Sequence, residues 1–120
     1  MRFTTLLAAF VLLAVMAIAG NQLPASNTWT GTSDTGKVAT TVTSSASGFV
    51  IVVDRTYTSP EGVVTRSSMT CALNSAGSAY ATPDGGEIEF DDVVDGNQKA
   101  YRYELRSASG GVREAGLVSQ

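Results

Sequence analysis

From residue 27 onward, hydrophobic and polar positions alternate in short runs, and each run ends in a turn-forming sequence. Alternation with a period of two is typical of a β-strand that buries one face. The pattern predicts strands at residues 28–33, 37–44, 48–58, 63–73, 78–82, 87–94, 99–107 and 112–118. No stretch of this region carries the 3.6-residue period of a helix of ten or more residues.

The connections between these runs are tight turns. Residues 59–62 read Ser-Pro-Glu-Gly, with Pro at the second and Gly at the fourth position of a type I turn. Asp95-Gly96 is a strong hairpin signal. Strands joined only by such turns form an antiparallel meander. We therefore expect an all-β fold of eight short strands, either a small up-and-down barrel or, as the alternative, a two-sheet sandwich.

Two runs depart from simple alternation. Residues 49–53 are apolar on both faces, so this strand is either covered on both sides or offers Val50 and Val52 to a partner. In the run at 87–94, Asp92 falls out of phase with Ile88 and Phe90, which predicts a bulge or an early strand end there.

The first 19 residues carry a different pattern. Arg2 precedes an almost wholly apolar run, and Ala17-Ile18-Ala19 is a small-x-small cleavage site. This is typical of a secretory signal peptide, and the run is too short for a confident membrane span. We expect residues 1–19 to be the signal peptide, 20–26 an N-terminal lead and 27–120 one β-domain, secreted or periplasmic and not inserted in a membrane after cleavage.

Charge and residue content exclude several functions. The net charge is −3, and loss of Arg2 would make it more negative, which argues against nucleic acid as a partner. The chain has no His, so it lacks the general base of Ser-His-Asp and Cys-His sites and the ligand of the usual zinc and copper sites. We expect no enzyme, no cofactor and no bound metal.

Cys71 is the only Cys, so it cannot form an internal disulfide. We expect it to be a small buried apolar residue, with a reactive thiol or an intermolecular bridge as the alternative.

The acidic residues gather late in the chain. They are Asp84, Glu87, Glu89, Asp91, Asp92 and Asp95. Calcium binds several oxygen ligands, but no calcium-loop sequence is present. Strand alternation explains the same residues, because Arg102 and Arg106 lie on the outward face of the next predicted strand. We expect Glu87, Glu89 and Asp91 to pair with these arginines across the hairpin.

Residues 27–32 (NTWTGT) open the first strand of this meander. They resemble the start of a calycin, the lipocalin and avidin-like group of small up-and-down barrels. The resemblance implies that Trp29 closes one end of the barrel and that Arg113, in the last strand, packs on it. The chain departs from the family at Asn27, which stands where a Gly is expected, and in its lack of disulfides.

Aromatic residues are spaced for the interior of such a barrel, as core or as the lining of a cavity. We expect an exported, non-enzymatic binding protein that holds a small, mainly apolar ligand. Its ligand-binding residues would be Trp29, Tyr57, Tyr101 and Tyr103. The alternative is a structural or protein-interaction module of the cell envelope or extracellular matrix, including an inhibitor, with an exposed sheet face for a protein partner.

Overall fold

The protein folds as one antiparallel sheet in sequence order. The computed structural model describes residues 21–95 and 98–120. Its strands are β1 (Thr28–Ser33), β2 (Val38–Ser44), β3 (Val50–Thr58), β4 (Val64–Leu73), β5 (Tyr80–Ala81), β6 (Glu87–Asp95), β7 (Gln98–Arg106) and β8 (Val112–Ser119). Each strand pairs with the next, and β8 pairs with β1, so the sheet closes into a barrel. The predicted all-β meander and barrel are confirmed, and the sandwich is wrong.

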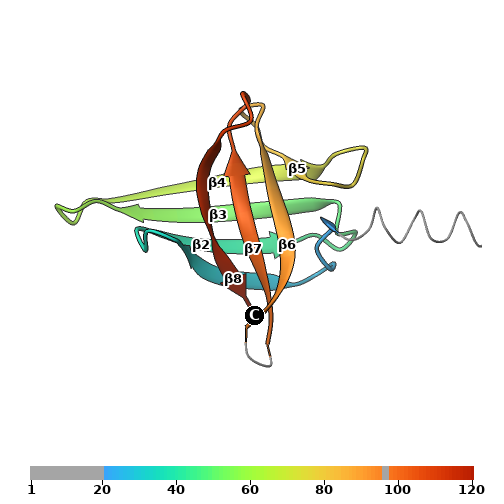
Figure 1. Cartoon of the computed structure of the whole chain (residues 1–120), viewed down its shortest axis with the longest axis horizontal. Coiled ribbons are helices and arrows are strands. Elements are labelled where there is room, and N and C mark those ends of the chain that lie inside the picture. The colour runs from blue at the N-terminus through green and yellow to red at the C-terminus, as the bar shows by residue number, and fades with distance from the viewer. Residues whose placement is uncertain (1–20, 96–97) are drawn as a thin grey trace, which may run out of the picture.

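Two groups of strands cross each other in the barrel wall. Figure 1 shows β2, β3 and β4 running across the direction of β6, β7 and β8, with the long β3–β4 hairpin extending beyond the crossing. The short β5 joins the two groups: it pairs with β4 at Ala72 and Leu73 and with β6 at Glu87 and Ile88. No helix in the described residues is long and apolar enough to cross a membrane.

The two ends of the barrel differ in chemistry. At one end β1 begins and β2 ends, and Trp29 packs edge-on against Tyr101 with ring centroids 5.6 Å apart. We call this the Trp29 end. The opposite end, where β1 and β3 end and β2 and β8 begin, is the mouth. Apolar side chains fill the Trp29 end, and polar ones gather at the mouth.

The apolar core occupies the Trp29 end and the middle of the barrel. Its buried members include Trp29, Val42, Ile51, Val53, Cys71, Tyr80, Ile88, Phe90, Tyr101 and Val118. Cys71 is fully buried, as predicted. Burial in apolar surroundings, with a smaller effect from Asp84, raises the pKa of its thiol to about 11.

The N-terminal lead is part of this core. Leu23 is only 2% exposed and belongs to the same cluster. The Tyr80 hydroxyl donates to the Gly48 carbonyl (2.8 Å) and accepts from the Leu23 N–H (3.0 Å). Residues 21–27 therefore cover one end of the barrel. The predicted signal peptide lies outside the described residues.

Close packing of β1 against β8, which closes the barrel, depends on two glycines. A Cβ on Gly116 would lie 2.4 Å from the Thr32 carbonyl oxygen and 2.7 Å from the Tyr103 ring. A Cβ on Gly31 would lie 1.7 Å from the Leu117 carbonyl oxygen. Real Cβ atoms do not approach so closely, so this contact between strands needs Gly at both positions.

The predicted bulge at Asp92 is wrong. Asp92 pairs with Tyr101 in an unbroken register that runs along β6 and β7. The register shift lies instead at Leu105 and Arg106, where β7 meets the start of β8. A bulge there gives β8 an extra residue at the mouth, next to the charged side chains described below.

Candidate functional site

A pocket of about 460 Å³ opens at the mouth of the barrel. The ends of four strands and the turn between β1 and β2 line it, with Ser33, Asp34, Thr35, Lys37, Val38, Arg55, Tyr57, Val112, Arg113, Glu114 and Ala115. The volume lies in the range of sites for small molecules. The lining holds three cationic and two anionic side chains in an acidic chain, so the pocket is locally cationic.

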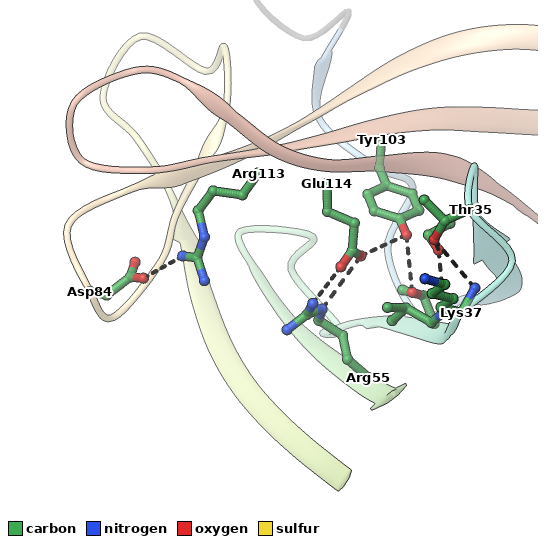
Figure 2. Close-up of polar contacts among 10 residues, drawn as sticks. Thr35, Lys37, Arg55, Asp84, Tyr103, Arg113 and Glu114 are labelled. Carbon is green, nitrogen blue, oxygen red and sulfur yellow. Dashed lines mark hydrogen bonds and ion pairs between the residues drawn. The ribbon is translucent and has the colours of Figure 1, made fainter. Parts of the chain in front are cut away.

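A partly buried polar network runs across the barrel at this pocket (Figure 2). Arg55 from β3 donates to both carboxylate oxygens of Glu114 from β8, with the Nε contact at 3.4 Å. The Tyr103 hydroxyl donates to Oε2 of Glu114 at 2.8 Å and lies 3.2 Å from the Thr40 hydroxyl. The Tyr103 hydroxyl has one hydrogen, and it donates that hydrogen to Glu114. Thr40 is therefore the donor in the contact between the two hydroxyls.

This network separates the pocket from the apolar core. Tyr103 is 1% exposed and Thr40 2%, whereas the Arg55 side chain keeps 25% of its surface exposed. Burial, with the hydrogen bond from Thr40 opposing it, raises the pKa of Tyr103 to about 12. The phenol therefore stays protonated at neutral pH and continues to donate to Glu114.

The rim of the pocket carries further charges. Arg113 donates to Asp84 at 2.8 Å, and Figure 2 shows its side chain turned toward that residue. Asp34 accepts two hydrogen bonds from Arg102, which lower the pKa of Asp34. Among the described residues, Lys37 has no carboxylate within ion-pair distance. Lys37 is thus the lining cation whose charge is not matched by a neighbour.

Comparison with known proteins adds no family to this description. No protein-family model matches the sequence, and no curated protein is significantly similar to it. The closed eight-stranded up-and-down barrel is consistent with a calycin-like fold. Since one fold hosts many functions, function has to be argued from the site.

The four predicted ligand-binding residues lie at different depths. Tyr57 is 40% exposed and lines the mouth pocket. Tyr103 lies beneath the pocket as part of the polar network. Trp29 and Tyr101 pack on each other in the core, 2% and 6% exposed. The structure therefore brings Tyr57 and Tyr103 to the mouth but keeps Trp29 and Tyr101 at the other end.

The predicted contact between Trp29 and Arg113 is wrong. The strands β1 and β8 are antiparallel, and Ser33 at the end of β1 pairs with Gly116. Arg113 lies three residues before Gly116, whereas Trp29 lies four residues before Ser33, so the two residues occupy opposite ends of the barrel. An Arg that packs on Trp29 would have to follow β8 rather than begin it.

The predicted charge pairs across β6 and β7 are confirmed in part. Arg106 lies 3.7 Å from Glu89. Arg102, however, pairs with Asp34 at 2.6 Å, because barrel closure brings the β1–β2 turn beside it. No group of three or more acidic, Cys or His side chains among the described residues is arranged to hold a metal ion.

Sequence reasoning missed the residues that form the site. Arg55 shares the face of its strand with Ile51 and Val53, and the sequence analysis assigned it no role. Glu114 and Lys37 belong to no sequence motif that would mark them as binding residues. Arg55 could have been found as a charge in an apolar alternation, since a buried guanidinium requires a carboxylate partner.

Proposed function

We propose that this protein is an exported, non-enzymatic binding protein whose barrel mouth holds a small ligand with an apolar body and one acidic group. The observation that carries the proposal is the mouth pocket, with the polar network of Arg55, Glu114 and Tyr103 as its floor and with a cationic rim. A floor of matched charges is stable without a ligand, and the pocket above it is large enough for a small molecule.

The lining favours an anionic group on the ligand. Arg55 and Arg113 are matched by Glu114 and Asp84, but Lys37 is not matched by any described residue. An acidic group beside Lys37 would complete the charge balance at the rim. The half-exposed guanidinium of Arg113 lines the same pocket but is paired with Asp84, so Lys37 remains the unmatched lining cation.

The apolar part of the ligand would lie against Tyr57, Val38 and Val112. Tyr57 and Val112 are 40% and 49% exposed, so both leave apolar surface in contact with water in the free protein. Covering them stabilises a complex by roughly 25 cal/mol for each Å² buried. The ligand thus rests above the polar network, and Trp29 and Tyr101 serve as core.

Export is a separate part of the proposal and has its own test. If residues 1–19 are removed as a signal peptide, N-terminal sequencing of the mature protein should begin at or near Gly20. A full-length product retained in a membrane would contradict it.

Three eight-carbon probes test the ligand class: octanoate, octanol and octylammonium, titrated by calorimetry. Octanoate should bind more tightly than octanol, and octylammonium most weakly. Lys37→Gln should weaken octanoate about two- to fivefold, as expected for a partly exposed charge pair, and leave octanol unchanged. Tyr57→Ala should weaken both.

Lys99→Gln is the matched control. It removes the same charge from an exposed Lys that pairs with Asp92 on β6, away from the mouth. Octanoate affinity should not change in this variant. Equal binding of octanoate and octylammonium, or equal effects of the two Lys variants, would contradict the proposed site.

A further inference from the structure

The barrel wall is open on one side, along β4. The neighbouring strand β5 has two residues and pairs with β4 only at Ala72 and Leu73. A longer β5 would place Pro83 opposite Thr70, and proline has no N–H for such pairing. The chain turns back instead at Thr82, whose N–H donates to the Gly86 carbonyl. Among the described residues, no strand pairs with residues 64–70 of β4 on that side.

A second pocket, of about 290 Å³, lies in this opening, and we call it the side pocket. Met69 of β4, Pro83 of the turn after β5 and Leu105 of β7 form its apolar part. Leu105 is 3% exposed, and Met69 packs against the buried core. The side pocket therefore reaches from the surface to the apolar interior of the barrel.

The charged residues around the side pocket do not favour an ionic ligand. Arg55 pairs with Glu114, and Arg113 pairs with Asp84. The Thr82 hydroxyl donates to Asp84, which leaves Ser67 and Ser68 as the other hydroxyls of the lining. With its charges matched and its deepest part apolar, the side pocket suits an uncharged, apolar group.

The side pocket adjoins the mouth pocket, because Arg55 and Arg113 line both. The two guanidinium groups point to different partners: Figure 2 shows Arg113 reaching toward Asp84 and Arg55 reaching toward Glu114. The junction between the pockets thus lies over the Arg55–Glu114 pair, with Arg113 at its edge.

The register of the strands makes both walls of this junction continuous. On β3, Tyr57 of the mouth pocket is two residues from Arg55, and Arg55 pairs with Ser67 of the side pocket. On the opposite wall, Glu114 of the mouth pocket pairs with Leu105 of the side pocket. A chain that lies in the mouth can therefore continue sideways along the same surfaces.

The way down into the barrel is closed. Tyr103 is 1% exposed and, with Thr40, forms the polar layer beneath the mouth pocket. An alkyl chain that entered there would break the hydrogen bond from Tyr103 to Glu114. The sideways course leaves these hydrogen bonds in place.

We propose that the ligand held at the mouth extends its alkyl chain across the Arg55–Glu114 pair and ends in the side pocket, against Met69 and Leu105. This inference rests on the proposed function and makes the ligand a linear carboxylate whose chain is longer than the mouth pocket covers. The methylenes of Arg55 offer apolar surface for the crossing. Met69 lies four residues along the hairpin from the position opposite Tyr57, about 13 Å at the rise of a β-strand.

Octanoate and dodecanoate, titrated by calorimetry, test the course of the chain. Octanoate would occupy the mouth, and the four further methylenes of dodecanoate would lie in the side pocket. A methylene that moves from water to fully apolar surroundings raises affinity about fourfold. Because the side pocket is partly polar, we expect about half of that factor for each methylene, and so a gain of roughly ten- to twentyfold for dodecanoate over octanoate.

Ser67→Phe places a ring in the side pocket. It should reduce the gain of dodecanoate over octanoate to less than about threefold and leave the affinity for octanoate unchanged. Thr70→Phe is the matched control, since Thr70 is exposed on the outer face of the same strand and does not line the side pocket. The full gain should persist in this variant.

The NMR signal of the Met69 methyl group provides a readout in the unmodified protein. Dodecanoate should shift this signal at saturation, whereas octanoate should leave it nearly unchanged. An unshifted Met69 signal with dodecanoate, or an equal gain in Ser67→Phe and Thr70→Phe, would overturn the inference.

The same titrations separate this inference from the proposed function. Octanoate binding that depends on Lys37, without the gain for dodecanoate, would overturn the inference and leave the proposed function intact. A Met69 shift with dodecanoate that is the same in Lys37→Gln would support the side pocket and contradict the proposed place of the acidic group. Absence of binding by both acids would overturn the two together.

Discussion

Removing Arg55 alone from its ion pair with Glu114 should destabilise the protein more than removing both charges together. The Glu114 side chain is 10% exposed and the Arg55 side chain 25%. Arg55→Met leaves the carboxylate of Glu114 largely buried with only the Tyr103 hydroxyl as a partner. Glu114→Gln leaves a guanidinium that can still reach water at the mouth.

The structure sets the size of the effect. Removing one partner of a fully buried pair costs about 3–5 kcal/mol. Because Arg55 is partly exposed and water can enter the mouth, we expect a smaller loss for Arg55→Met, about 2–3 kcal/mol. Glu114→Gln should cost about 1 kcal/mol, since Tyr103 can donate to the amide oxygen. The double variant should cost only about 1–2 kcal/mol.

Urea unfolding followed by Trp29 fluorescence measures these values, because the single Trp is buried in the native state. The coupling energy from the four proteins should be about 1–3 kcal/mol. Additive losses in the double variant would refute the reasoning.

Three further changes test other parts of the fold. Gly116→Ala should destabilise by about 1–3 kcal/mol and shift the NMR signals of Tyr103, because the new Cβ would overlap its ring and the Thr32 carbonyl; unchanged stability and signals would contradict the close approach. Leu23→Ala should cost about 2–4 kcal/mol in urea unfolding, since it opens a cavity in the core, and a loss below 1 kcal/mol would show that the lead does not cover the core. The raised pKa of Cys71, about 11 against 9.0, contributes stability that is present below pH 9 and lost between pH 9 and 11. Over that interval the free energy of unfolding should fall by roughly 2–3 kcal/mol more than in Cys71→Ala, and parallel pH profiles of the two proteins would disprove it.

The sequence predicted the strands because their signals are local. Alternation located β2, β3 and β7 within one or two residues, and the turn residues fixed the meander order. Asp92 was misjudged because a strand end near a hairpin can place a polar side chain in the inward phase without a bulge. The true register shift lies opposite the start of β8, where no residue type marks it.

The site was less predictable because it depends on barrel closure. Arg55 and Glu114 are 59 residues apart, and Arg102 and Asp34 are 68 apart. Alternation shows that Arg55 points inward, but only the closed order of strands shows that Glu114 faces it. The resemblance to calycins placed Trp29 in the right kind of environment, yet it could not place Arg113, whose position depends on the exact register of β1 against β8.

The hydrogen bond between Leu23 and Tyr80 has a consequence for the order in which the chain can fold during synthesis. Leu23 is made before its partner Tyr80, which follows 57 residues later. Until β5 emerges, Leu23 and the strands already made have no cover at that end of the barrel. The N-terminal lead is thus synthesised before all eight strands and is among the last segments to reach its final position.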